Sequence, residues 1–139
     1  MTRRLELERR YAASPDRVFD AWTDTALLTQ WWGCAPDMLW TVHTWDVRVG
    51  GQILVSMDID GTPFEMRGEF EVVDRPNHLR YRWGETETVD VRIEADGDGA
   101  HLRLTHDGLP SDEQLGIVDG GWTHAVDLLG ERLTTTRTT

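Results

Sequence analysis

Residues 111–133 read SDEQLGIVDGGWTHAVDLLGERL, and this stretch decides the fold. Its apolar residues recur at i, i+3 and i+4, which is the spacing of an amphipathic helix. They are Leu115, Val118, Trp122, Val126, Leu129 and Leu133. Ser111 and the acidic pair that follows it are typical of a helix start. Gly120 and Gly121 each cost about 1 kcal/mol relative to Ala inside a helix, which predicts a close packing contact or a bend there. The stretch therefore predicts a long C-terminal helix with one apolar stripe to bury.

The residues before this helix alternate with period 2 over most of 39–106, which is typical of antiparallel strands. Six strands are predicted, at 39–49, 52–59, 62–73, 79–83, 89–93 and 102–106. Gly68, inside the third of them, indicates a bulge or a close backbone approach. A meander of this length forms a sheet with an apolar face, and the long helix is the element that can cover it.

The N-terminal part adds one strand, at 3–11, and two short helices. Ser14 and Pro15 are a typical first-turn pair, and they predict a helix with Val18, Phe19 and Trp22 on its apolar stripe. A second helical segment is predicted at 25–32. The fold class is therefore α+β, with a curved antiparallel sheet of about seven strands wrapped around the C-terminal helix. We expect a single domain over residues 1–139, with 133–139 as a frayed tail.

Composition limits the partners of this chain. Fourteen basic and twenty-five acidic residues give a net charge of −11 and a pI near 4.7, so nucleic acid and anionic membranes are not expected partners. Every basic residue is Arg, which excludes Schiff-base and P-loop lysine chemistry. Mean hydropathy is −0.47 and no signal-peptide-like run is present, so a cytoplasmic location is expected. Cys34 is alone, so no internal disulfide is expected, and we interpret it as a small apolar filler.

Seven short blocks carry a family resemblance. They read SPDRVFDAW (14–22), WWG (31–33), DVRVGG (46–51), DG (60–61), GEFEV (68–72), LRLTHDGL (102–109) and GW (121–122). In this order they resemble the START-like (SRPBCC) superfamily, and within it the branch named after the activator of the heat-shock protein 90 ATPase. The resemblance implies a helix-grip fold, in which the sheet and the C-terminal helix enclose an apolar cavity. Two turns depart from the pattern, at Val49 and at Pro76.

The five histidines do not have metal-ligand spacing. His101 and His106 are five apart on one predicted strand and so point to opposite faces, while His78 falls in a turn and His124 on the outer side of the helix. We expect no metal and no cofactor. By alternation, His43 and His106 point inward, and we interpret them as polar groups that orient a ligand carbonyl, phenol or carboxylate. The alternative is a half-buried histidine bonded to backbone or water.

Aromatic residues dominate the predicted inner surface. Trp45, Tyr81, Trp83 and Phe64 fall on concave faces, Trp122 lies on the helix stripe, and Trp31 and Trp32 are expected at a rim. Trp22 and Trp40 are assigned to packing. Aliphatic and sulfur-containing candidates complete the predicted ligand-binding set: Val55, Met57, Met66, Val91 and Val126. The alternative is that these rings simply fill the core.

The leading hypothesis is a protein that binds a hydrophobic, aromatic or polyketide-like small molecule, as a monomer or homodimer. A second is a cavity enzyme, such as a polyketide cyclase, in which His43, Tyr81 or His106 guides proton transfer. A third is a self-resistance or chaperone-regulating protein. The resemblance leaves all three open because the superfamily also includes lipid carriers, co-chaperone domains and antibiotic self-resistance proteins, and fold alone does not fix function.

Overall fold

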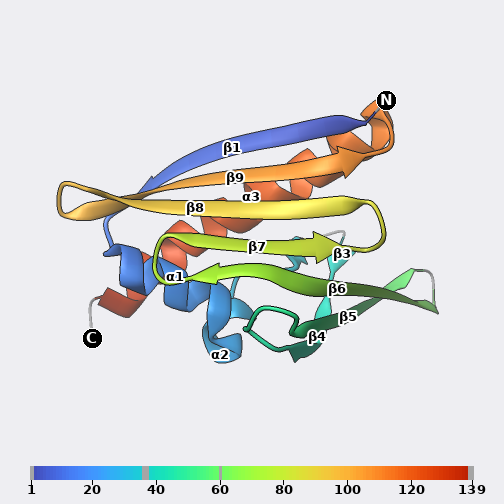
Figure 1. Ribbon diagram of the computed structural model, residues 1–139, viewed down its shortest axis with the longest axis horizontal. Helices are drawn as coiled ribbons and strands as arrows, with labels where there is room; N and C mark the ends of the chain where they lie inside the picture. The colour runs from blue at the N-terminus through green and yellow to red at the C-terminus, as the bar shows by residue number, and fades with distance from the viewer. Residues whose placement is uncertain (1, 36–37, 60, 138–139) are drawn as a thin grey trace.

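Seven antiparallel strands form one curved sheet in the order β1-β9-β8-β7-β6-β5-β4, and a separate pair, β2-β3, lies beside it (Figure 1). The computed structural model describes residues 2–35, 38–59 and 61–137, with the side chains of 34–35, 38, 59 and 135–137 left out. The elements in chain order are β1 (Arg3–Tyr11), α1 (Pro15–Thr23), α2 (Thr25–Leu28), β2 (Cys34–Ala35), β3 (Met38–Leu39), β4 (Thr41–Trp45), β5 (Gln52–Ile59), β6 (Thr62–Asp74), β7 (His78–Trp83), β8 (Glu87–Asp96), β9 (Gly99–Leu109) and α3 (Asp112–Arg137). The predicted α+β class and the sheet with a long C-terminal helix are confirmed. The side chain of Cys34 lies outside the described residues.

The long helix α3 lies behind β1, β9 and β8 in Figure 1, and it contacts β1 and β9. Tyr11 at the end of β1 anchors it, since the hydroxyl donates to the Val126 carbonyl at 2.9 Å and the ring would lie 3.3 Å from a Cβ placed on Gly130. A Cβ on Gly120 or Gly121 would meet no atom of the described residues within 4 Å. A close helix contact is therefore found at Gly130, and the structure does not show the close contact that was one of the two alternatives predicted for Gly120 and Gly121.

Helix α3 also runs further than the sequence pattern predicted. It continues to Arg137, through residues that were assigned to a frayed tail. Leu133 is buried, and its carbonyl accepts a hydrogen bond from the Arg17 guanidinium at 2.7 Å. This contact with α1 stabilises the last turns of the helix. Residues 138–139 lie outside the described part of the chain.

The two short helices follow β1 and cover one end of the sheet. The Ser14 hydroxyl accepts from the Arg17 amide, Pro15 opens α1, and Val18 and Trp22 are buried, as the sequence pattern predicted. Helix α2 ends at Leu28, earlier than predicted, and the chain continues in turns to Gly33, whose φ is +71°.

Bulges in β4 and β6 change the side-chain alternation of these two strands. In β4, Val42 pairs with Val55 and Thr44 with Leu54, so His43 is an extra residue between them. In β6, Phe70 pairs with Tyr81 and Val72 with Arg80, which makes Glu71 the extra residue. A bulge moves the following residues to the opposite face. His43 is accordingly exposed, with Nε2 2.7 Å from the Ser56 hydroxyl, and its predicted inward position is wrong.

Gly68 is the close backbone approach that the sequence indicated. It pairs with Ile53 on β5 and with Trp83 on β7. A Cβ at this position would lie 2.1 Å from the Arg82 carbonyl oxygen. Only glycine fits this contact between β6 and β7, so the sheet can curve tightly here.

An ion cluster on β7 and β8 surrounds Asp90. Its carboxylate accepts hydrogen bonds from His78 Nε2 at 2.8 Å, Arg80 Nη1 at 3.3 Å and Arg92 Nε at 3.2 Å. The side chain is only 15% exposed. Burial acts to raise the pKa of Asp90, but the hydrogen bonds from His78 and Arg92 outweigh it, and the pKa lies below its ordinary value.

This lowered pKa predicts an acid-dependent stability. A carboxyl group whose pKa is depressed by folding stabilises the protein above its unfolded pKa of about 3.9, and that contribution disappears as the pH falls through the folded value. We expect Asp90→Asn to lower the free energy of unfolding by about 1–2 kcal/mol at pH 7. Urea unfolding of the wild type and the variant at pH 7 and pH 3 measures this loss. The difference in the free energy of unfolding between the two proteins should be smaller at pH 3 than at pH 7. The exposed Glu94→Gln on the same strand is the control and should change little at either pH. An equal loss for Asp90→Asn at both pH values contradicts the prediction.

Candidate functional site

Aromatic rings line the concave face of β4, β6 and β7. Trp45 contacts Phe70 and Tyr81 edge to face, with ring centroids 5.4 Å apart in both pairs. Trp32 lies over them, 5.2 Å from Trp45 and 5.8 Å from Trp83. The Trp45 indole N–H donates to the Trp22 carbonyl at 3.0 Å, which ties β4 to α1. Edge-to-face contacts of this kind stabilise a rigid aromatic layer.

The predicted site residues separate by depth. Eight are buried: Trp31, Trp32, Trp45, Val55, Tyr81, Val91, His106 and Val126. Four are partly exposed: Met57, Met66, Trp83 and Trp122. Phe64 is 41% exposed, and His43 points away from the site. The middle of the predicted cavity is thus occupied by side chains, and the accessible candidates remain at its borders.

Trp31 and Trp32 are core residues and do not form a rim. The sequence pattern placed them on the last turn of a helix, but α2 ends at Leu28 and a turn folds both rings inward. The Trp31 indole N–H donates to the Ala21 carbonyl at 3.0 Å. Trp22 and Trp40 pack as predicted. Trp22 stacks on Trp122 at 5.7 Å, and Trp40 meets Trp83 at 5.5 Å.

A buried polar network connects α3 to the sheet next to Trp83. The Trp122 indole N–H donates to His106 Nδ1 at 2.9 Å, and His106 Nε2 lies 2.7 Å from Glu87 Oε1. Because an indole nitrogen can only donate, Nδ1 must accept, and the ring proton lies on Nε2, which donates to the carboxylate. His106 is 4% exposed and Glu87 is 16% exposed. Both His106 nitrogens are therefore occupied, and the two ends of the network, Glu87 and Trp122, are the members that are partly exposed.

Glu87 was not among the predicted site residues. It pairs with Trp83 at the start of β8 and lies on the same face as Val89 and Val91. The sequence pattern started this strand at Val89, because residues 84–88 form a polar run that is typical of a turn. Extending the period-2 alternation backward from Val89 would have placed Glu87 on the inner face.

We name the group of Met66, Trp83, Glu87 and Trp122 the open-end site. Met66 and Trp83 lie close to the β7–β8 turn, where a Cβ on Gly84 would be 3.3 Å from the Met66 sulfur. On the helix side, a Cβ on the neighbouring Gly121 would have open space around it, with no atom of the described chain within 4 Å. The site thus combines partly exposed apolar surface with one carboxylate.

Tyr81 lies beneath this site and is fully buried. Burial raises the pKa of its hydroxyl far above the ordinary value, and the neighbouring Trp32 lowers it only in part. The hydroxyl therefore stays neutral, and Tyr81 is not suited to act as a base near pH 7. Within the part of the chain that the structure describes, no group of three or more His, Cys, Asp or Glu residues could hold a metal ion.

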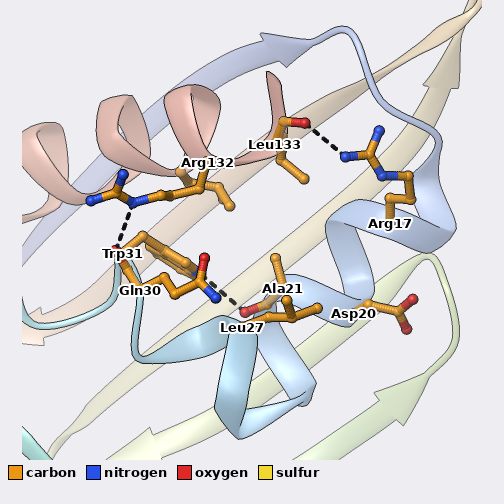
Figure 2. A pocket seen from close by; sticks show the side chains of 9 residues that line it. Arg17, Asp20, Ala21, Leu27, Gln30, Trp31, Arg132 and Leu133 are labelled. Atoms are coloured by element: carbon orange, nitrogen blue, oxygen red, sulfur yellow. Dashed lines mark hydrogen bonds between the residues drawn. The ribbon is translucent and has the colours of Figure 1, made fainter. Parts of the chain in front are cut away.

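A pocket of about 210 Å³ lies elsewhere, between α1, α2 and the C-terminal half of α3 (Figure 2). Nine residues line it: Arg17, Asp20, Ala21, Leu27, Gln30, Trp31, Leu129, Arg132 and Leu133. Trp31 is the member of the predicted set found there. This pocket is distinct from the predicted space between the sheet and α3.

The curved antiparallel sheet, the two short helices after β1 and the long helix α3 define a helix-grip protein of the α+β class. The family described as "Activator of Hsp90 ATPase homolog 1-like protein" matches residues 12–134, and the chain belongs to this family. The family lies within the SRPBCC superfamily, as the sequence resemblance indicated.

Several solved structures share the fold. Protein CV1439 from Chromobacterium violaceum is 20% identical, with a TM-score of 0.82 over 94% of this chain and 97% of its own. SA2116 from Staphylococcus aureus, a protein of unknown function, is 17% identical, with a TM-score of 0.83 over 100% of this chain and 98% of its own. CalU16 from Micromonospora echinospora is 26% identical, with a TM-score of 0.73 over 99% of this chain and 80% of its own. None of the curated proteins matches the chain. Among the described residues, no helix is both long and apolar enough to span a membrane.

Proposed function

We propose that this protein binds a hydrophobic small molecule with an aromatic ring system at the open-end site. The family fold commonly binds hydrophobic ligands. The observation that carries the proposal is the partly exposed apolar surface of Trp83, Met66 and Trp122 beside the Glu87 carboxylate. Ring faces and a flexible methionine favour a flat apolar ligand, and each square ångström of apolar area buried contributes about 25 cal/mol.

The Glu87 carboxylate supports a further restriction on the ligand. A carboxylate accepts hydrogen bonds and donates none, and it is held in place by His106. A ligand with a phenolic hydroxyl would place that donor on Glu87 and its rings on Trp83. This combination favours an aromatic or polyketide-like phenol over a plain hydrocarbon, which has no donor for Glu87. It also disfavours a ligand that carries a carboxylate, because Glu87 would repel that charge.

Mass spectrometry of protein purified from its native host tests the proposal most directly. Denaturing the protein should release a co-purified aromatic compound, and the mass of this compound should stay the same when it is incubated again with the protein. A finding of no bound compound, together with no change in tryptophan fluorescence on addition of aromatic phenols, would overturn the proposal.

A matched pair of probes tests the role of Glu87. We expect 1-naphthol to bind and Glu87→Gln to weaken this binding about tenfold, because a hydrogen bond to a charged group contributes about 1.5–3 kcal/mol. Binding of 1-methoxynaphthalene, which has no donor, should be unchanged. Glu85→Gln, an exposed residue in the same turn, is the control. Isothermal titration calorimetry measures the two probes on the wild type and both variants, and an equal effect of Glu87→Gln on both probes would contradict the assignment.

One observation favours an enzyme as the second candidate. The pairing of Glu87 with His106, itself held by Trp122, resembles a general base with an orienting partner. In that case Glu87 accepts the proton and His106 positions it. Incubation with the co-purified compound distinguishes the two functions, since an enzyme changes the mass of the compound with turnover and a binding protein returns it unchanged.

A further inference from the structure

The pocket between α1, α2 and α3 has an apolar interior. Its apolar lining comes from all three helical elements and the turn after α2: Ala21, Leu27, Trp31, Leu129 and Leu133. Four of these five residues are buried, and Leu27 is half-buried. The Trp31 indole N–H is already bonded to the Ala21 carbonyl. The interior therefore offers an indole ring and aliphatic groups with no unsatisfied indole donor, which suits a ring of matching size.

Two arginines connect α3 to the α1–α2 segment beside this pocket, and they lie on opposite sides of it in Figure 2. Arg17 donates from Nη2 to the Leu133 carbonyl at 2.7 Å. Arg132 donates from Nε to the Gln30 carbonyl at 3.2 Å. Each bond ties α3 to the α1–α2 segment, so the walls are fixed before any ligand arrives. Preformed walls of this kind reduce the ordering cost of binding.

The charge around the pocket is positive in a chain whose net charge is −11. Arg17 and Arg132 line it, and Asp20 is the acidic residue in the lining. The Asp20 carboxylate is engaged by the Arg75 guanidinium, which also bonds Asp16 at 2.9 Å. Because Arg75 is shared between two carboxylates, it offsets the negative charge of Asp20 only in part, and the lining carries two arginines against one aspartate. A guanidinium has five N–H donors, and the bond to the Leu133 carbonyl uses one of those of Arg17.

The size of the pocket restricts the ligand. A volume of about 210 Å³ lies below the range of about 300–1,000 Å³ that is usual for drug-sized ligands. It corresponds to about seven water molecules at the ≈30 Å³ that each occupies in the liquid. One six-membered ring with a short polar substituent fits this space.

We propose that this pocket is a second binding site, independent of the open-end site, for a small carboxylate that carries a single ring. The ring packs on Trp31, Leu27 and Leu129, and the carboxylate accepts from the Arg17 guanidinium. Such charge-assisted hydrogen bonds are about twice as strong as neutral ones. The site selects an anion, whereas the carboxylate of Glu87 selects a hydrogen-bond donor at the open-end site.

Nuclear magnetic resonance of the indole N–H groups tests the proposal with benzoate as the probe. The signal of Trp31 should shift on titration, and those of Trp83 and Trp122 should not. Arg17→Gln should weaken benzoate binding about tenfold, and Arg17→Lys, which keeps the charge, should recover most of it. Arg103→Gln, an exposed arginine on β9 that pairs with Glu8, is the control and should bind as the wild type does.

A second variant and a second probe complete the test. Leu27→Trp fills the pocket without changing charge and should abolish the Trp31 response, while the remaining indole signals report whether the variant is folded. Benzyl alcohol, a neutral molecule of similar shape, should bind more weakly than benzoate and be insensitive to Arg17→Gln. The proposal is overturned if benzoate leaves the Trp31 signal unchanged, or if Arg17→Gln and Arg103→Gln bind it equally. A response confined to Trp83 and Trp122 also overturns it and leaves the open-end site as the place where such compounds bind.

Discussion

The Gly108→Ala variant is expected to lose about 3 kcal/mol of its free energy of unfolding. Gly108 has a φ of +84°, which an L-residue adopts at a cost of about 1–2 kcal/mol. In addition, an alanine Cβ would lie 2.1 Å from the Thr86 carbonyl oxygen and 3.1 Å from the Glu87 Cα. These are backbone atoms, so the clash is relieved only if β8 and β9 separate. Urea unfolding followed by circular dichroism measures the loss.

Two other glycines separate the causes of this effect. Gly97 has a φ of +58° but open space around its Cβ position within the described residues, so Gly97→Ala isolates the backbone strain and should cost about 1 kcal/mol. Gly120 lies in α3 with equally open surroundings, and Gly120→Ala should increase stability by up to about 1 kcal/mol. A loss for Gly108→Ala no larger than that for Gly97→Ala would contradict the described backbone contact.

The same variant affects the open-end site. Separation of β8 from β9 at Gly108 moves the start of β8, where the Glu87 carboxylate accepts a hydrogen bond from His106 of the neighbouring strand. We therefore expect Gly108→Ala, where it folds, also to lose the Glu87-dependent part of 1-naphthol binding. The glycine fixes the backbone that positions the carboxylate.

The parts of the fold with uninterrupted alternation could be predicted from the sequence. In β8, Val89, Val91 and Ile93 are all buried, as period 2 requires, and β9 likewise buries Leu104 and His106. The stripe of α3 was equally clear. Local periodicity and long-range packing agree in these elements, so each residue has one possible orientation.

The bulges could not be predicted from the same pattern. At His43 one extra residue enters β4, and only its pairing with β5 reveals this. Alternation counted from Leu39 therefore assigned position 43 to the inner face. The rule depends on position alone, so it would have given the same result for any residue there. In the same way, a turn after Leu28 moved Trp31 from an expected rim into the core, because burying a large ring outweighs the local helix preference.

The candidate site depends on contacts between distant segments. Glu87, His106 and Trp122 belong to β8, β9 and α3. The sequence places His106 and Trp122 on inner faces without indicating that they meet, and the predicted strand did not reach Glu87. Their contact follows from the register Val89–His106 and from the position of α3. The second pocket was even less predictable, because it is a space left between side chains of three helices.

The His106→Ala variant tests the polar network and is expected to lose about 3 kcal/mol of stability. The substitution removes a buried ring that makes two hydrogen bonds. It leaves the Trp122 indole N–H and the partly buried Glu87 carboxylate without this partner, and an unsatisfied buried group costs about 1–3 kcal/mol, more when it is charged. Denaturant unfolding measures the loss. His124→Ala, on the exposed face of α3, is the matched control and should change stability by less than about 0.5 kcal/mol.

A double-mutant cycle with Trp122→Phe then shows whether the network acts as a unit. Phenylalanine keeps an apolar ring on α3 and removes the indole N–H that His106 Nδ1 accepts. If the hydrogen bond couples α3 to β9, the double variant should be less destabilised than the sum of the single variants by about 1 kcal/mol. Additive losses would mean that His106 contributes by packing alone.

In that case Glu87 would not depend on α3 for its orientation, and Trp122→Phe should leave 1-naphthol binding intact. A coupled network predicts that Trp122→Phe weakens 1-naphthol binding and has less effect on 1-methoxynaphthalene, because only the former depends on the position of the carboxylate.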